Sequence, residues 1–271
     1  MGTRSGAKRP RANTPKKKRG ARLGQHFLTA PWAASALVAA VRIEADVPVL
    51  EIGPGTGNLT KELLRTGAHV LAVEKDPLLI DTLHARFSSE IASKQLTILN
   101  EDIRNFSPES AGLRAGEYVL AANIPYYITG DIIRTFLTSK NHPARMALLV
   151  QKEVAVRIAR DKKESILSLS VKVYGTPKYV KTVGKGCFSP PPSVDSAILL
   201  VDDISRSQFT QVSEERFFSV VKTAFASKRK MLGGNLKNIV HLDRFHACNI
   251  SPQARAESLP LEKWLCLSKE A

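Results

Sequence analysis

Three glycines separated by single residues follow an apolar, strand-like run in the segment LEIGPGTGNLT, residues 50–60. Gly53, Gly55 and Gly57 place bare backbone between a predicted strand and a predicted helix, where a nucleotide-like ligand can approach closely. Glu74 and Asp102 stand at the ends of the next two strand-like runs. Glu74 is placed to accept hydrogen bonds from ribose hydroxyls, and Asp102 to meet an adenine amino group. Each acid alone could be a solvated loop carboxylate, but the three signals together predict an adenosine-binding site.

The spacing of the glycines distinguishes between ligands. A dinucleotide fingerprint has its third glycine one position later, where this chain has Asn58. The pattern G-x-G-x-G instead resembles the first motif of S-adenosylmethionine methyltransferases, whose ligand has no pyrophosphate. Glu51, two residues before the first glycine, also fits that motif. We therefore expect S-adenosyl-L-methionine as the cofactor.

The segment Asn123-Ile124-Pro125-Tyr126 ends the fourth strand-like run and resembles the [DNS]-x-P-[YFW] motif of enzymes that methylate amino nitrogens. An adenine amino group is a poor nucleophile because its lone pair is delocalised into the ring. The Asn123 side-chain oxygen and a nearby backbone carbonyl can accept its two hydrogens and direct the lone pair outward. Proline fixes the turn, and Tyr126 offers a stacking face for a base drawn out of its stack. Alternatively, the four residues form only a strand-to-helix turn.

Elements that would position these residues alternate between short apolar runs and longer helical patterns, which is typical of an α/β sheet covered on both faces. Buried central strands are expected at 47–52, 69–74, 95–100, 118–123 and 145–151. Residues 59–67 and 76–87 have helical spacing, with Gly67 ending the first helix and Asp76 capping the second before Pro77. Residues 179–188 and 193–201 suggest a closing pair of strands. After residue 203 the pattern becomes helical.

Basic residues are concentrated at the N-terminus. The chain has 271 residues, with 40 basic and 25 acidic side chains, and nine of the basic ones fall within residues 1–22, where there is no acid. Such a block cannot bury apolar surface, so we expect a disordered tail that meets a polyanion, with RNA the natural partner. A solubility tail, a nuclear-import signal and an organelle transit peptide are the alternatives, although Pro10 and Pro15 argue against an amphipathic transit helix.

Hydropathy and cysteine spacing bear on the cellular compartment and on metal or disulfide chemistry. No apolar run approaches the length that crosses a bilayer, and the N-terminus lacks the apolar centre of a secretory signal, so we expect a cytoplasmic protein. Cys187, Cys248 and Cys266 are far apart and form no C-x-x-C pair. This spacing suggests neither a disulfide framework nor a zinc site, and we expect reduced thiols and no metal.

A family resemblance joins these motifs. LGQHFL (23–28), EIGPGTGNLT, VEKDP, EDIRNF, NIPYYI, CFSPPPSVDSAILL and FASKRKMLGGNL resemble, in order, the rRNA adenine dimethyltransferases, and most of all the bacterial small-subunit enzymes. The resemblance implies a Rossmann-like class I methyltransferase domain with a small C-terminal helical domain. It further implies that His26 and Leu28 cover the cofactor and that Phe188 packs on the target adenine beside Tyr126. His26 stands where many members have asparagine, and Tyr127, also often asparagine, is expected to be a packing residue.

The helical C-terminal region contains a candidate RNA-binding segment. Lys228, Arg229 and Lys230 precede a glycine pair, a grouping suited to phosphates rather than base edges, although a solvated helix end is the alternative. We expect a tail at 1–22, a methyltransferase domain at 23–203 and an RNA-binding domain at 204–271. The expected protein is a monomer that dimethylates N6 of adjacent adenines in a small ribosomal subunit precursor. A large-subunit methyltransferase of the antibiotic-resistance type and a non-catalytic assembly or transcription factor are the alternatives.

Overall fold

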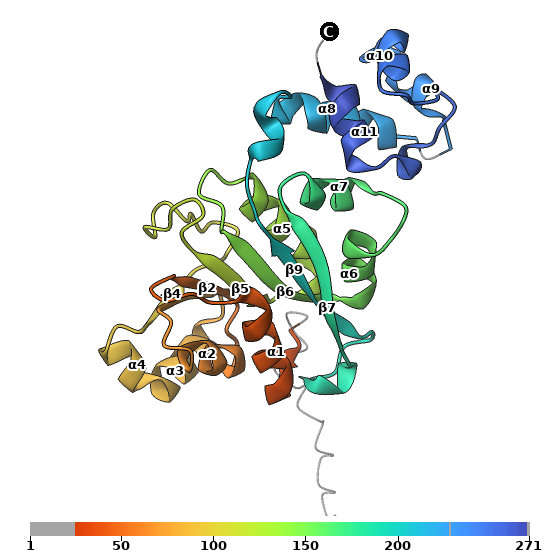
Figure 1. Ribbon diagram of the computed structural model, residues 1–271. Helices are drawn as coiled ribbons and strands as arrows, with labels where there is room; N and C mark the ends of the chain where they lie inside the picture. The colour runs from red at the N-terminus through yellow and green to blue at the C-terminus, as the bar shows by residue number, and fades with distance from the viewer. Residues whose placement is uncertain (1–24, 228, 270–271) are drawn as a thin grey trace, which may run out of the picture.

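A seven-stranded sheet forms the centre of the computed structural model, which describes residues 25–227 and 229–269 (Figure 1). Its strands are β2 (Val49–Ile52), β3 (Val70–Glu74), β4 (Leu96–Asn100), β5 (Val119–Asn123), β6 (Arg145–Gln151), β7 (Thr176–Val183) and β9 (Ser196–Asp202). They lie in the order β4-β3-β2-β5-β6-β9-β7. The first five are parallel, and β9 is antiparallel to both of its neighbours. The predicted α/β architecture is confirmed, and the predicted tail lies outside the described residues.

Helices cover both faces of this sheet because side chains of each buried strand alternate between two cores. On β2, Val49 packs in the core beneath α1 and α2, whereas Leu50 packs in the core beneath α5 and α7. The helices of this region are α1 (Pro31–Val41), α2 (Asn58–Leu64), α3 (Pro77–Arg86), α4 (Ser88–Ala92), α5 (Thr129–Thr138), α6 (Lys152–Ala159) and α7 (Ile166–Lys172). Within residues 25–227 and 229–269, no helix is long and apolar enough to cross a membrane.

The five predicted parallel strands begin within two residues of their expected positions and end where expected. One detail was wrong: β4 is not buried on both faces, because it lies at the edge of the sheet and exposes Thr97. The predicted closing pair is present as β7 and β9, although β7 ends at Val183 and a turn follows. A second, two-stranded sheet, β1 (Phe27–Leu28) with β8 (Phe188–Ser189), was not predicted.

The predicted cap of α3 and the predicted end of α2 are confirmed. Asp76 caps α3, its Oδ1 accepting the Leu78 N–H at 3.0 Å, and Pro77 occupies the first helical position. Gly67 has a φ of 84° after α2, where its N–H donates to the Leu64 carbonyl at 3.0 Å. A residue with a side chain disfavours that left-handed conformation. These helix ends bound the turns on either side of β3.

The C-terminal region consists of helices joined by turns in its described part, with no strand there, as predicted, and it lies above the sheet in Figure 1. Its α-helices are α8 (Glu214–Phe225), α9 (Leu232–Leu236), α10 (Leu242–Ala247) and α11 (Leu261–Ser268). Phe217 and Trp264 are fully buried there and belong to the same apolar cluster as Leu148 of β6. The apolar core therefore continues from the sheet into this region, and its assignment as a separate domain stays a prediction.

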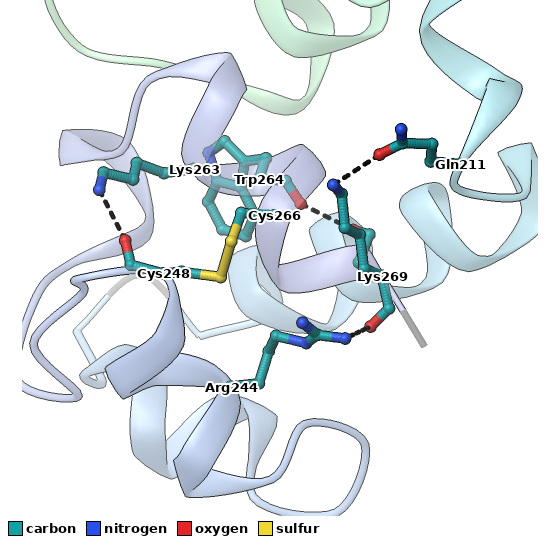
Figure 2. Close-up of a disulfide and its surroundings, with 8 residues drawn as sticks. Gln211, Arg244, Cys248, Lys263, Trp264, Cys266 and Lys269 are labelled. Atoms are coloured by element: carbon teal, nitrogen blue, oxygen red, sulfur yellow. Dashed lines mark hydrogen bonds between the residues drawn. A yellow bond between two sulfur atoms is a disulfide. The ribbon is translucent and has the colours of Figure 1, made fainter. Parts of the chain in front are cut away.

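A disulfide joins two elements of the C-terminal region (Figure 2). It links Cys248, just after α10, to Cys266 in α11, with their Cα atoms 5.9 Å apart. The prediction that these cysteines are reduced thiols is therefore wrong, whereas Cys187 is a free thiol. The linear spacing of 18 residues gave no sign of the pair, because only the packing of the two elements brings the sulfur atoms together.

Candidate active site

A cavity lies at the carboxyl ends of β2, β3 and β5, where the chain leaves neighbouring strands in opposite directions. Such a reversal in an α/β sheet is where ligands generally bind. Of the predicted site residues, the cavity lining contains His26, Gly53, Gly55, Glu74, Asp102, Asn123, Pro125 and Tyr126. Leu28, Gly57 and Phe188 are absent from that lining. Most of the predicted set, drawn from separate motifs, is thus gathered around one hollow.

The glycine loop after β2 has two different requirements for glycine. A Cβ placed on Gly53, whose φ is 65°, would meet no atom within 4 Å, so bare backbone faces the cavity there. A Cβ on Gly57 would instead lie 2.5 Å from Cε2 of Phe87. Gly57 therefore permits the start of α2 to pack on Phe87, whereas Gly53 leaves room for a ligand.

Glu74, the last residue of β3, is 3% exposed and holds the glycine loop. Its carboxylate accepts the backbone N–H of Gly55 at 3.1 Å and that of Asp76 at 2.9 Å. Burial raises the pKa of Glu74, and the backbone hydrogen bonds oppose that rise. The carboxylate thus sits at the cavity with its position fixed by the loops on either side.

Glu51 lies one strand away and is fully buried. Neither of its carboxylate oxygens has a hydrogen-bond partner within the described residues, and burial raises its pKa to about 8. A carboxyl group in that environment is held in its neutral form at pH 7. Glu51 does not line the cavity, although it precedes the glycine loop by only two residues.

Asp102 is the second of two acidic residues after β4, and it is paired with two cations. Its carboxylate lies 2.7 Å from Nζ of Lys75 and accepts from the guanidinium of Arg104 at 2.5 Å. Hydrogen bonds from Arg104 and Lys75 hold the pKa of Asp102 well below its usual range. Asp102 therefore stays ionised at the cavity, with Arg104 also in the lining.

Asn123 ends β5, and its amide is oriented by the segment that precedes α1. Its Nδ2 donates to the backbone carbonyl of His26 at 2.9 Å. Because the nitrogen is used in that way, the side-chain oxygen of Asn123 is the atom left to accept a hydrogen bond in the cavity. The same segment also reaches the glycine loop, where Asn58 Nδ2 donates to the Leu28 carbonyl at 2.7 Å and a Cβ on Gly55 would lie 2.9 Å from the Phe27 ring.

The aromatic residues near Asn123 differ from expectation in two places. Tyr126 lines the cavity and its hydroxyl lies 2.7 Å from Ser196 Oγ. Tyr127 was predicted to be a packing residue, which is wrong: its side chain is 70% exposed at the cavity edge, because the short 3₁₀ turn after Pro125 directs it outward. Phe188 is 5% exposed, because its strand β8 pairs with β1 opposite Leu28 and places both side chains in the core beneath α1.

The candidate RNA-binding segment lies between α8 and α9. Arg229 and Lys230 are exposed there, and Lys228 lies outside the described residues. The segment is held at its base by Asn235, whose Nδ2 donates to the carbonyls of Ala224 at 2.8 Å and Ser227 at 3.2 Å. The cations are therefore presented on an anchored turn, apart from the cavity lining.

Several residues at the cavity escaped the sequence reasoning. Phe27, Lys75 and Arg104 line it, and each lies within two residues of one that was assigned a role in the same motif. Ser196 gave only a weak signal, a polar residue at the start of an apolar strand. In the described ranges, 25–227 and 229–269, no group of three or more His, Cys, Asp or Glu side chains is placed to hold a metal ion.

Comparison with known proteins places the chain in a family. A family model described as Ribosomal RNA adenine dimethylase matches residues 16–271. A ribosomal RNA small subunit methyltransferase A from Dehalococcoides mccartyi (strain CBDB1) is 39% identical over 254 residues, which cover 90% of this chain and 86% of the relative. Among solved structures, a dimethyladenosine transferase from Plasmodium falciparum is 25% identical with a TM-score of 0.77, covering 89% of this chain and 96% of that one.

A second solved structure, the 23S rRNA methyltransferase ErmE, is 24% identical with a TM-score of 0.73 and covers 89% of this chain and 98% of that one. At that identity it supports the fold alone. The fold is thus that of the class I methyltransferases, as the family resemblance implied. Taken with the family match over nearly the whole sequence, these findings show that the chain belongs to the ribosomal RNA adenine dimethylase family.

Proposed function

We propose that the protein transfers methyl groups from S-adenosyl-L-methionine to N6 of adjacent adenines in small-subunit rRNA, forming dimethyladenosine during ribosome biogenesis. The observation that carries this proposal is the orientation of Asn123, whose amide nitrogen is bonded to His26 and whose oxygen is left for the cavity. The small-subunit relatives favour that substrate over the large subunit. The proposed substrate is a small-subunit precursor in the cytoplasm. The protein is proposed to act as a monomer, since one copy of the chain supplies the cavity residues.

The cavity suits the cofactor. Gly53 leaves bare backbone facing the hollow, and the fixed, buried carboxylate of Glu74 is placed to accept from ribose hydroxyls. The charged Asp102 marks the adenine end, the Phe27 ring lies over the glycine loop, and His26 lines the same cavity. S-adenosyl-L-methionine, when bound, supplies a methyl group on a positively charged sulfur, which an amino nitrogen can attack.

Two acceptors prepare the target amino group. The Asn123 oxygen is one of them. The Pro125 carbonyl already accepts the Ile128 N–H at 3.2 Å, so we assign the second role to the carbonyl of Ile124. Together they bind the two amino hydrogens and favour tetrahedral geometry at nitrogen, an interaction that strengthens as the transition state is approached. Tyr126 holds the base by stacking.

RNA outside the cavity is held by charge. Arg229 and Lys230 are exposed on an anchored turn and contact phosphates, with Lys228 proposed for the same role. Phosphate contacts position the rRNA without reading its sequence, so the identity of the modified bases depends on how the folded RNA presents them. The helical region at 204–271 is accordingly proposed as the RNA-binding domain.

The test is methyl transfer by the purified full chain from labelled S-adenosyl-L-methionine to unmodified small and large ribosomal subunits offered separately. We expect label on two adjacent small-subunit adenines, located by mapping the modified bases. Label on the large subunit alone would support the antibiotic-resistance type of activity. Binding to either subunit without any transfer would support the non-catalytic assembly factor.

Asn123→Ala supplies the matched test of mechanism. Loss of one preorganised acceptor is expected to lower single-turnover methyl transfer by about a hundred- to a thousandfold while RNA affinity changes little. Thermal melting must first show that the variant is folded. Transfer at the wild-type rate by folded Asn123→Ala would contradict the proposed role of the amide oxygen.

A further inference from the structure

The ring of Tyr126 is held from two sides by residues far from it in the sequence. Its hydroxyl lies 2.7 Å from Oγ of Ser196, which is fully buried at the first position of β9. On its other side the His26 ring lies 5.8 Å away between centroids, tilted by 33°. His26 is itself fixed, since its Nδ1 lies 2.8 Å from the carbonyl oxygen of Pro190. The half-buried ring at the cavity therefore has a defined position.

Ser196 is supported by a rigid frame. As part of β9 it pairs with Gln151 of β6 on one side and Val183 of β7 on the other. The preceding residue, Asp195, accepts the Lys152 N–H on its carbonyl and the Lys185 N–H on its carboxylate, both at 3.0 Å. The serine hydroxyl is thus presented at a fixed point of the sheet.

The contact between Ser196 and Tyr126 joins a fully buried serine to a half-buried phenol, which limits how the ring can move. A buried hydroxyl that loses its partner is destabilised, so the phenol and the serine hydroxyl hold each other in place. Burial raises the pKa of Tyr126 and keeps the phenol in its neutral, hydrogen-bonding form. A ring anchored at its far end has less rotational freedom to lose when a base stacks on its face.

We propose that Ser196 is a positioning residue for methyl transfer, fixing the Tyr126 ring in the orientation that receives the target base. This inference rests on the proposed function, in which Tyr126 stacks on the adenine. Ser196 contacts neither base nor cofactor in this scheme, since it acts through the phenol. Its substitution should therefore alter the use of RNA and leave cofactor binding as it is.

The experiment compares wild type, Ser196→Ala, Tyr126→Phe and the double variant in single-turnover methyl transfer, with saturating cofactor and varied concentrations of small subunits. Ser196→Ala is expected to lower the efficiency of RNA use by about tenfold. Tyr126→Phe keeps the ring but removes the hydroxyl, and is expected to show a similar loss. The double variant should be no worse than either single variant, because all three lack the same hydrogen bond. Losses that multiply would overturn the proposal.

Ser168→Ala is the matched structural control. Ser168 is also fully buried and hydrogen-bonded, in the capping box of α7, and it does not line the cavity. We expect it to lower the urea midpoint of unfolding without altering the dependence on RNA concentration. Cofactor affinity, measured by calorimetry, should be unchanged in Ser196→Ala. If Ser168→Ala is as stable as Ser196→Ala and shows the same loss of RNA use, the role of Ser196 is merely structural.

The outcomes separate this inference from the proposed function. If the wild-type protein methylates rRNA and Ser196→Ala does so with equal efficiency, only the positioning role is wrong. If the wild type transfers no methyl group to either ribosomal subunit, the proposed function fails, and the positioning role falls with it.

Discussion

Reduction of the bridge between Cys248 and Cys266 is expected to lower the free energy of unfolding by about 3 kcal/mol. The two cysteines are 18 residues apart. Closing a loop of that length lowers the conformational entropy of the unfolded chain, which destabilises the unfolded state by about this free energy. The bridge ties the end of α10 to α11, where Trp264 is fully buried against the apolar cluster (Figure 2). Such a loss is a large fraction of the stability of an ordinary domain.

Trp264 makes the effect measurable. The chain has two tryptophans, so a Trp32→Phe background leaves Trp264 as the only indole and reports on the region around the bridge. Urea unfolding is followed by its fluorescence in the oxidised protein, after reduction, and in Cys266→Ser. Cys187→Ser in every sample removes the third thiol from exchange.

The expected result is a lower urea midpoint for both the reduced protein and Cys266→Ser, with the two nearly equal. Thiol titration must confirm two free thiols after reduction. If the midpoint is the same before and after a confirmed reduction, the bridge does not stabilise the fold, and packing of α11 alone holds the region. In a reducing compartment, where disulfides are rare, the protein would work at the lower stability.

Three further perturbations test the cavity and the RNA-binding turn. Glu74→Ala should weaken cofactor binding about ten- to a hundredfold, because a charged acceptor is lost; unchanged affinity by calorimetry would rule out its contact with ribose. Glu51 has a folded pKa of about 8 against an ordinary value of 4.5, so the folded state keeps a proton that the unfolded chain loses, and stability should decline as pH rises between these values. Glu51→Gln should flatten that decline, as urea midpoints at several pH values would show, and an equally steep decline would contradict the argument. Arg229→Gln or Lys230→Gln should weaken RNA binding and reduce its salt slope by about one, without moving the methylated bases.

The parallel part of the sheet and the residues at its strand ends could be predicted because their signals are local. Apolar runs mark the strands, and the carboxyl ends of neighbouring parallel strands meet at one edge. Gly53, Glu74 and Asn123 each end or directly follow such a run and Asp102 lies two residues after one, so their meeting at one cavity follows from the sheet alone. The roles of these residues toward a ligand stay predictions.

What could not be predicted depends on pairing across long stretches of chain. The burial of Phe188 opposite Leu28 depends on the two-residue pairing of β1 with β8, and its contact with the target adenine stays a prediction. The disulfide between Cys248 and Cys266 and the contact between Tyr126 and Ser196 also join separate elements. No local sequence pattern indicates that these elements lie side by side. Tyr127 was misjudged for a related reason, since the direction of its side chain depends on the turn after Pro125 rather than on composition.

The segment from His26 to Leu28 shows why motifs that look independent in the sequence act together. Its His26 carbonyl accepts from Asn123, its Leu28 carbonyl accepts from Asn58, and the Phe27 ring lies over the position of Gly55. These contacts reach two different motifs, the glycine loop and the segment that begins at Asn123, and β1 alone is too short to be stable. The orientation of the Asn123 oxygen therefore depends on the same segment that covers the glycine loop. A change that displaces this segment would disturb cofactor binding and the presentation of the amino-group acceptor at once, so the two properties cannot be tuned separately there.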